Sequence, residues 1–231
     1  MINHFQPACL LAAVAGICFH LTMNIATAAE RALFDFTTAT NVPGWQVVND
    51  DVMGGVSASN FGVTNGVAVF RGEVSLENNG GFASVRSLPS HHDLAGCDTF
   101  LIRVRGDGRC YKFTARTDRS FDSPIYQVSF PTKQGEWEEL RLPMKGFVPT
   151  FRGRALSGQP PLDPTKVTSV GFLISDKQAG PFRLEVAWIK VTSRAGRACS
   201  RSQIQDDCES QPNGVVDQSK ARPQESSKAG A

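Results

Sequence analysis

The sequence predicts an all-β protein, an antiparallel β-sandwich or barrel, and three observations support this. Short apolar runs alternate with turn residues at intervals of about 8–12 residues from Arg31 to about Val191. Most of these runs alternate apolar with polar residues, which is typical of strands with one face on the core and the other in water. Glycine and proline supply 21 and 13 of the 231 residues, and no window past residue 28 shows a convincing helical period.

Nine segments show the strand pattern clearly, and a further strand begins at Trp45. The nine are residues 32–36, 67–72, 82–86, 99–105, 110–116, 126–130, 137–142, 170–174 and 182–189. Gly106-Asp107-Gly108 predicts a tight hairpin turn between the fourth and the fifth, because Asp-Gly tolerates a positive φ. Residues 146–164 are too rich in glycine and proline for a strand or helix, so we expect one long loop there.

Three regions are expected along the chain. Residues 1–28 are interpreted as a signal peptide, because an uncharged apolar stretch ends in Ala26-Thr27-Ala28, an A-x-A cleavage pattern. Residues 31–192 form the β-sandwich domain. Residues 193–231 have almost no bulky apolar side chains and are expected to be a disordered C-terminal tail. Export would place the protein in the periplasm or outside the cell, whereas a true start at Met23 would leave it in the cytoplasm.

Composition and charge exclude some classes of function. Apolar residues make up 41% of the chain and charged residues 20%, which is enough apolar material for a sizeable core. The formal net charge is only +2, so we expect no nucleic-acid partner.

The cysteines do not form an obvious framework. Cys97 and Cys110 flank the expected hairpin but lie about 20 Å out of register, whereas a disulfide needs Cα atoms within about 7 Å. We therefore predict that both are free and buried. Cys199 and Cys208 are expected to close a small loop in the tail if the compartment is oxidising.

Residues suited to catalysis or metal binding are scarce. His91 and His92 are the histidines that follow the expected signal peptide, and neighbours on a strand face opposite sides. The chain has no C-x-x-C pair, no G-x-S-x-G elbow and no G-x-G-x-x-G loop. We therefore expect no enzyme activity, no cofactor and no metal site. A hydrolase built on two carboxylates stays open as an alternative if Asp50, Asp51, Glu73 and Glu77 cluster.

Three stretches of the chain carry a closer resemblance. A strand runs into an acidic and then a Gly-Gly loop over residues 45–57, and a second Gly-Gly segment lies in 70–86. The third stretch is 147–154, followed downstream by 174–182. Together they closely resemble the complex I intermediate-associated protein 30 family. This resemblance implies a galactose-binding-domain-like jelly-roll sandwich that acts as a chaperone or assembly factor for NADH:ubiquinone oxidoreductase (complex I), without enzyme activity.

The positions that resemble the family fall into two groups. The binding candidates are Asn49, Asp50, Asp51, Met53, Arg86 and Arg152, and the structural glycines are Gly54, Gly55, Gly80, Gly81 and Gly153. Glycine pairs tolerate positive φ, so their loops turn sharply. The two aspartates are expected to pair with one of the two arginines across the rim, or to bind sugar hydroxyls or a cation. The plainer alternative is that the whole set only fixes loops at one end of the sandwich.

Two functions follow from this sequence. The first is a non-catalytic binding module of the assembly-factor type, whose protein partner is a membrane-complex subunit or an assembly intermediate. The alternative is a carbohydrate-binding module of the exported envelope type, whose partner is a glycan. In that case Trp45, Trp137 or Trp188 would serve as a stacking platform, although buried sandwich tryptophans are more common.

Overall fold

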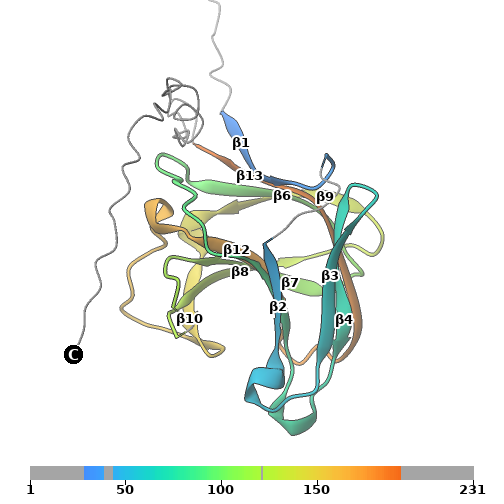
Figure 1. Ribbon diagram of the computed structural model, residues 1–231. Coiled ribbons are helices and arrows are strands. Elements are labelled where there is room, and N and C mark those ends of the chain that lie inside the picture. Colours follow the sequence, from blue (N-terminus) through green and yellow to red (C-terminus); the bar gives the residue numbers. More distant parts are fainter. Residues whose placement is uncertain (1–28, 39–43, 121, 194–231) are drawn as a thin grey trace, which may run out of the picture.

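The computed structural model describes residues 29–38, 44–120 and 122–193, which form two antiparallel sheets (Figure 1). The strands are β1 (Glu30–Asp35), β2 (Trp45–Asn49), β3 (Ala58–Thr64), β4 (Val67–Val74), β5 (Ala83–Ser87), β6 (Thr99–Arg105), β7 (Cys110–Arg116), β8 (Ile125–Pro131), β9 (Trp137–Pro143), β10 (Val148–Phe151), β11 (Arg154–Ala155), β12 (Ser169–Ile174) and β13 (Gly180–Thr192). The six-stranded sheet runs β3–β4–β13–β6–β9, with β1 paired to β13. The seven-stranded sheet runs β11–β10–β8–β7–β12–β5–β2. The predicted antiparallel β-sandwich is confirmed.

Short 3₁₀ helices join some of the strands. They are η1 (Asp50–Met53), η2 (Glu77–Asn79), η3 (Met144–Gly146) and η4 (Pro164–Lys166). Within the described ranges there is no helix of the length and apolar character needed to span a membrane.

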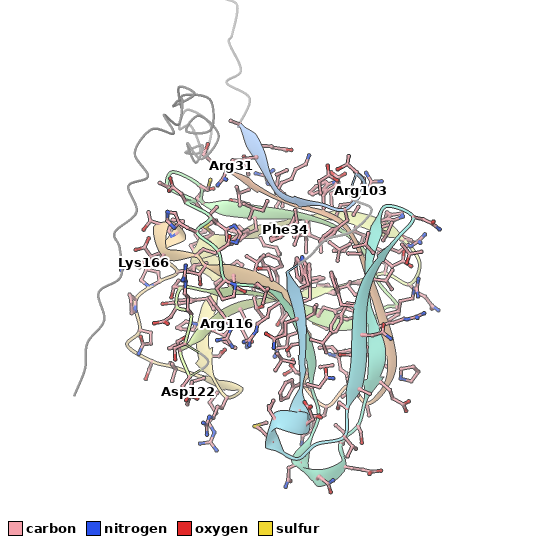
Figure 2. All side chains as sticks on the ribbon, in the orientation of Figure 1. Arg31, Phe34, Arg103, Arg116, Asp122 and Lys166 are labelled. Atoms are coloured by element: carbon pink, nitrogen blue, oxygen red, sulfur yellow. The ribbon has the colours of Figure 1, made fainter. Side chains whose placement is uncertain are left out.

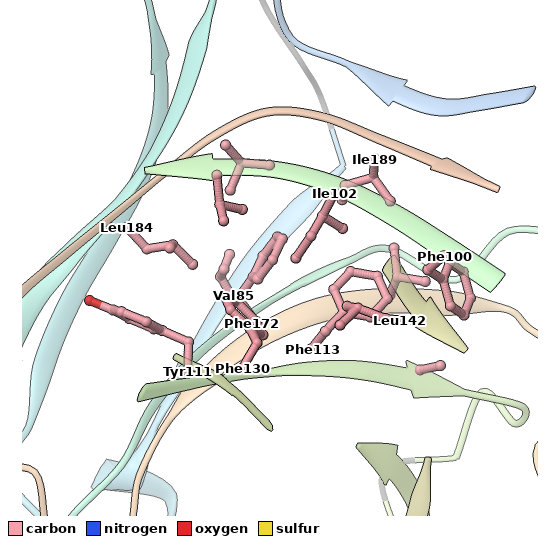
Figure 3. Packing of buried hydrophobic residues seen from close by; sticks show 14 of the residues in the cluster. Val85, Phe100, Ile102, Tyr111, Phe113, Phe130, Leu142, Phe172, Leu184 and Ile189 are labelled. Carbon is pink, nitrogen blue, oxygen red and sulfur yellow. The ribbon is translucent and has the colours of Figure 1, made fainter. Parts of the chain in front are cut away.

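The core lies between the two sheets because the strands direct alternate side chains inward (Figure 3). In β7, Tyr111 and Phe113 are fully buried, while Lys112 between them is partly exposed. The Phe113 ring lies 5.4 Å from the ring of Phe172 in the same sheet and 5.1 Å from that of Phe100 in the opposite sheet, measured between centroids. Burying one phenylalanine contributes about 1.5–3 kcal/mol. These rings therefore pack the two sheets against each other. The side chains on the outer faces of the sheets do not take part in this core.

The segment from Gly106 to Arg109 joins the two sheets, and the predicted hairpin is wrong. β6 pairs with β13 and β9, whereas β7 pairs with β8 and β12 in the other sheet. The Asp107 carboxylate holds this corner by accepting hydrogen bonds from the Tyr111 hydroxyl at 3.0 Å and the Arg183 N–H at 2.9 Å. An Asp-Gly turn signals a sharp reversal but does not specify which sheet the chain enters next.

Two hairpins of the structure were not predicted from the sequence. The expected loop over 146–164 instead contains β10 and β11, which a two-residue turn joins. A second hairpin pairs β3 with β4 around Asn65 and Gly66, both of which have positive φ. Asn-Gly is the strongest short-range hairpin signal, so the sequence contained enough information to predict this turn.

Cys97 and Cys110 differ in state. Cys97 is buried and disulfide-bonded, so the prediction that it is free is wrong. Cys110 is free as predicted, but it is partly exposed rather than buried. The register argument excluded only a disulfide between Cys97 and Cys110. It did not exclude a disulfide between Cys97 and another cysteine. The predicted signal peptide, the Cys199–Cys208 bond and the tail beyond Ser193 concern residues outside the described ranges.

Candidate functional site

A cleft of about 480 Å³ lies on the outer face of the seven-stranded sheet. Its lining residues extend from β2 to β10, two strands of this sheet that are labelled in Figure 1, and they include Arg116 and Asp122, which are labelled in Figure 2. Its floor comes from strands whose opposite faces carry the core, so the packing of Phe113 and Phe172 also fixes the floor. The residues that line the floor are Val48, Ser84, Arg86, Lys112, Thr114, Arg116, Ile125, Gln127, Thr150, Ser169 and Leu173.

The strand register places these side chains in rows across the sheet. Arg86 of β5 lies opposite Gly171 of β12, which lies opposite Thr114 of β7, and Thr114 lies opposite Gln127 of β8. Gly171 is closely enclosed, because a Cβ there would lie 2.2 Å from the carbonyl oxygen of Val85. In this row, the polar side chains of Arg86 and Thr114 therefore lie on either side of Gly171, which has no side chain.

One wall of the cleft is the η1 loop, which Asp50 fixes from beneath. Asp50 is fully buried. Its Oδ1 accepts a hydrogen bond from the Ser57 N–H at 2.9 Å, and its Oδ2 accepts bonds from the Ser57 hydroxyl at 2.5 Å and the Gly81 N–H at 2.6 Å. The Phe82 N–H donates to Oδ2 at 3.2 Å. One carboxylate thus ties η1 to the start of β3 and to the loop before β5.

The pKa of Asp50 reflects these bonds. Burial is the largest single influence and acts to raise the pKa, but the hydrogen bonds from Ser57, Gly81 and Phe82 outweigh it. The pKa of Asp50 therefore lies below its ordinary value of 3.8, and the group is a carboxylate at neutral pH.

Two glycines make room for this carboxylate. A Cβ on Gly55 would lie 2.4 Å from Asp50 Cγ, and a Cβ on Gly80 would lie 2.6 Å from Asp50 Oδ2. Both positions need glycine because any side chain would collide with the buried acid. This is a different reason from the positive φ that the sequence suggested for them, since neither residue has one.

The opposite wall is the β10–β11 turn. Arg152 and Gly153 have φ values of 48° and 76°, which is the two-residue turn with both φ positive that matches the twist of a hairpin. The Arg152 guanidinium lies 5.2 Å from the ring centroid of Phe151 and 3.5 Å from the Asp122 carboxylate. Because both charges are well exposed, this ion pair contributes little to stability.

The floor carries a desolvated positive charge. Burial and the nearby charge of Arg86 lower the pKa of Arg116 to about 10, and burial lowers the pKa of Arg86. Both arginines stay protonated at neutral pH. Lys112 of the same floor binds the Asp176 carboxylate at 2.8 Å.

The binding residues expected from sequence have different positions here. Met53, Arg86 and Arg152 all line the cleft, as do Gly80, Gly81 and Gly153. Asp50 lies buried behind it, Asn49 accepts a hydrogen bond from the Ser59 hydroxyl at 2.6 Å, and Asp51 is exposed. The expected ion pair between Asp50 and an arginine is replaced by bonds to backbone N–H groups and Ser57.

Sequence reasoning missed most of the floor. Lys112, Thr114 and Arg116 alternate with the buried side chains of β7, a pattern that was interpreted only as a face in water. The alternation was the available signal, but the sequence does not show which outer face is hollowed. The three tryptophans lie elsewhere. Trp45 packs against Phe34 and Phe61, Trp137 lies under Arg103 and Arg105, and Trp188 lies under Lys190.

The two-sheet β-sandwich is a fold that this chain shares with solved carbohydrate-binding modules. Among solved structures, the chain is similar to the family 11 carbohydrate-binding module of a cellulosomal cellulase of Clostridium thermocellum, with 17% identity, a TM-score of 0.56 and coverage of 73% of this chain and 96% of that one. The same module in complex with a β-1,3-1,4-mixed-linked tetrasaccharide gives a TM-score of 0.54, again with 17% identity, over 73% of this chain and 97% of that one. At this identity the similarity shows the fold alone.

Sequence comparison identifies the family. The family model for complex I intermediate-associated protein 30 matches residues 34–186. The mitochondrial complex I intermediate-associated protein 30 of Mus musculus is 30% identical over 182 residues, which cover 70% of this chain and 56% of the relative. The mitochondrial protein of that name from Drosophila melanogaster is 26% identical over 180 residues, covering 68% of this chain and 61% of the relative. The chain therefore belongs to the complex I intermediate-associated protein 30 family, and it spans little more than half the length of these relatives.

The expected location of the protein is corrected by these relatives. The periplasmic or secreted location inferred from residues 1–28 is contradicted, because the relatives are named as mitochondrial proteins. The apolar stretch of residues 8–29 ends in small residues as export signals do, but residues 1–7 contain no lysine or arginine, which export signals usually carry there.

Proposed function

We propose that this chain is a non-catalytic protein-binding module that acts in complex I assembly, and that it contacts its partner through the cleft and the loop tip beside it. Membership of the family supports the assembly role. The observation that supports this choice of surface is a set of four exposed apolar side chains, Val52, Met53, Val56 and Leu76, which we call the tip and of which Val52 and Met53 line the cleft.

The tip is apolar and exposed, and hydrogen bonds hold the loop that carries it. Its four side chains are between 45% and 58% exposed, and Val52 and Met53 also line the cleft. The Asp50 network beneath it fixes the loop, and the Ser57 hydroxyl accepts a hydrogen bond from the Ser75 N–H at 3.0 Å. A surface that is already ordered loses little entropy when a partner covers it, so exposed apolar groups on a fixed loop are suited to binding protein.

The carboxylates near the cleft support a role without catalysis. Asp50 accepts four hydrogen bonds and has a lowered pKa, which does not suit a general acid or base. The acids that line the cleft, Asp122 and Asp176, contact Arg152 and Lys112. Each acid is thus engaged by protein groups, and this arrangement favours binding over proton transfer.

The glycan alternative has weaker support. Sugar rings bind by stacking on exposed aromatic faces, and the described lining of the cleft includes two aromatic rings, Phe82 and Phe151, but none of the three tryptophans. Phe151 already lies beside the Arg152 guanidinium. The fold shared with carbohydrate-binding modules does not by itself bring their ligand to this chain.

Affinity capture with variants of the tip tests the proposed function. The double variant Val52→Ser with Met53→Ser should lose at least about tenfold in recovery of complex I subunits, because removing apolar contacts of this size costs more than about 1.4 kcal/mol. Leu88→Ser is the matched control, since Leu88 is 52% exposed but lies at the other end of β5. Equal recovery by both variants, or no recovery by the wild type, would reject the proposal.

A further inference from the structure

Two arginines on the cleft floor flank the same strand. Arg86 projects from β5 and Arg116 from β7, and β12 runs between these strands. Arg86 lies opposite Gly171 of β12, and Arg116 lies opposite Ser169, two residues along. Gly171 has no side chain, so at this position β12 places no side chain between β5 and β7. The charge of Arg86 contributes to the lowered pKa of Arg116.

The cleft carries an excess of positive charge. Its described lining includes four basic residues, Arg86, Lys112, Arg116 and Arg152, and two acidic ones, Asp122 and Asp176. Asp122 lies against Arg152, and Asp176 lies against Lys112. Arg116 donates a long hydrogen bond, of 3.4 Å, to the carbonyl oxygen of Ser120. The centre of the floor is therefore cationic, and both of its arginines are partly withdrawn from water.

The dimensions of the cleft suit an extended chain. Lining residues come from β2, β5, β12, β7, β8 and β10, which are six successive strands of one sheet. At about 4.8 Å between neighbouring strands, the floor is about 24 Å across. An extended polypeptide rises about 3.3 Å per residue, so about seven residues would cross it. Val48, Leu173 and Ile125 add apolar contacts between the polar groups of the floor.

We propose that Arg86 and Arg116 form a carboxylate subsite, and that the cleft binds an extended segment of a protein partner in which acidic and apolar side chains alternate. This inference rests on the proposed function and names the chemistry of the segment that the cleft accepts. A guanidinium binds a carboxylate through two parallel N–H···O bonds, and the bound acid neutralises the excess charge on the floor. Thr114 and Gln127, in the same row as Arg86, supply hydrogen bonds to the backbone of the segment.

Charge is what separates this partner from a neutral glycan. A neutral ligand that covers the floor removes water from two guanidinium groups and returns no opposite charge, which costs free energy. An acidic segment compensates for the lost water with charge-assisted hydrogen bonds. Protein is favoured over an acidic polysaccharide because the mouth of the cleft is apolar, with Val52 and Met53 on its rim.

Fluorescence anisotropy with two labelled heptapeptides tests the subsite. One peptide alternates leucine with aspartate, and the other alternates leucine with asparagine. The wild type should bind the aspartate peptide at least about tenfold more tightly, as expected for a desolvated charge pair. The double variant Arg86→Gln with Arg116→Gln should lose this preference, whereas Arg141→Gln, an exposed arginine on β9 of the other sheet, should keep it.

A thermal unfolding measurement shows whether the double variant Arg86→Gln with Arg116→Gln is folded. If it is not, two further measurements still test the subsite. Arg86→Lys with Arg116→Lys keeps the charge without the forked geometry and should retain a reduced preference. For the wild type, raising salt from about 50 to about 500 mM should weaken binding of the aspartate peptide and leave the asparagine peptide unchanged. Equal binding of both peptides, or tighter binding of a galacturonate heptamer than of the aspartate peptide, would overturn the subsite.

Failure of the subsite is distinguishable from failure of the proposed function. If Arg86→Gln with Arg116→Gln captures complex I subunits as well as the wild type, while Val52→Ser with Met53→Ser does not, the subsite is wrong and the proposed function stands. If the wild type captures none but still prefers the aspartate peptide, the proposed function is wrong and the subsite stands on its own.

Discussion

The Asp50 carboxylate receives four hydrogen bonds in a fully buried position, so its removal should be costly. Asp50→Asn places an amide NH₂ among groups that donate, and leaves at least one of them without an acceptor. We expect the free energy of unfolding to fall by roughly 2–4 kcal/mol, measured by chemical denaturation. Asp51→Asn is the matched control, since Asp51 is exposed, and it should change stability by less than about 0.5 kcal/mol.

The same carboxylate should make stability depend on pH in acid. Its pKa is lower in the folded protein than its ordinary value of 3.8, so the folded state favours the ionised form. The resulting stabilisation is fully present above the unfolded-state pKa and is lost as the pH falls through the lower folded-state pKa. Unfolding midpoints measured from about pH 6 to about pH 2 should fall less steeply for Asp50→Asn than for the wild type. Parallel curves would show that Asp50 contributes nothing to acid unfolding.

At the scale of elements, the η1 loop depends on the absence of a side chain at Gly55. A Cβ there would lie 2.4 Å from Asp50 Cγ, so either the loop or the buried acid must shift. We expect Gly55→Ala to destabilise the fold by about 1–3 kcal/mol, as overpacking does. Gly62 of β3 serves as the control, because a Cβ there would meet nothing within 4 Å, and Gly62→Ala should be near neutral or slightly stabilising. A similar loss of stability at both positions, measured by chemical denaturation, would mean that clearance around Asp50 is unimportant.

Elements were more predictable than their partners in the sheets. The residues of β6 and β7 alternate so clearly that the sequence predicts both strands with the observed bounds. Their assignment to one hairpin failed because Asp107 binds Tyr111 and Arg183, and the Arg183 contact lies 76 positions away in sequence. A turn signal is local, whereas the choice of sheet depends on contacts distant in the chain.

At the scale of the whole molecule, the sequence predicted only part of the site, because the site also depends on contacts between residues that are distant in the chain. Met53, Arg86 and Arg152 were recognised by resemblance, and the fold brings all three to one cleft. Arg116 and Thr114 were not, because polar residues on an outer strand face look alike whether the face is flat or hollowed. Asp50 was expected on the surface as a binding group, but its burial depends on Ser57 and Gly81 closing over it.

The protein is expected to meet its partner on the seven-stranded sheet rather than on the six-stranded one. Photo-crosslinking in cells that contain complex I tests this most directly, with benzoylphenylalanine in place of Met53 at the cleft or in place of Arg141 on the six-stranded sheet. We predict a covalent adduct with a complex I subunit from position 53 and none from position 141. Adducts from position 141 alone, or equally from both positions, would contradict this placement of the partner.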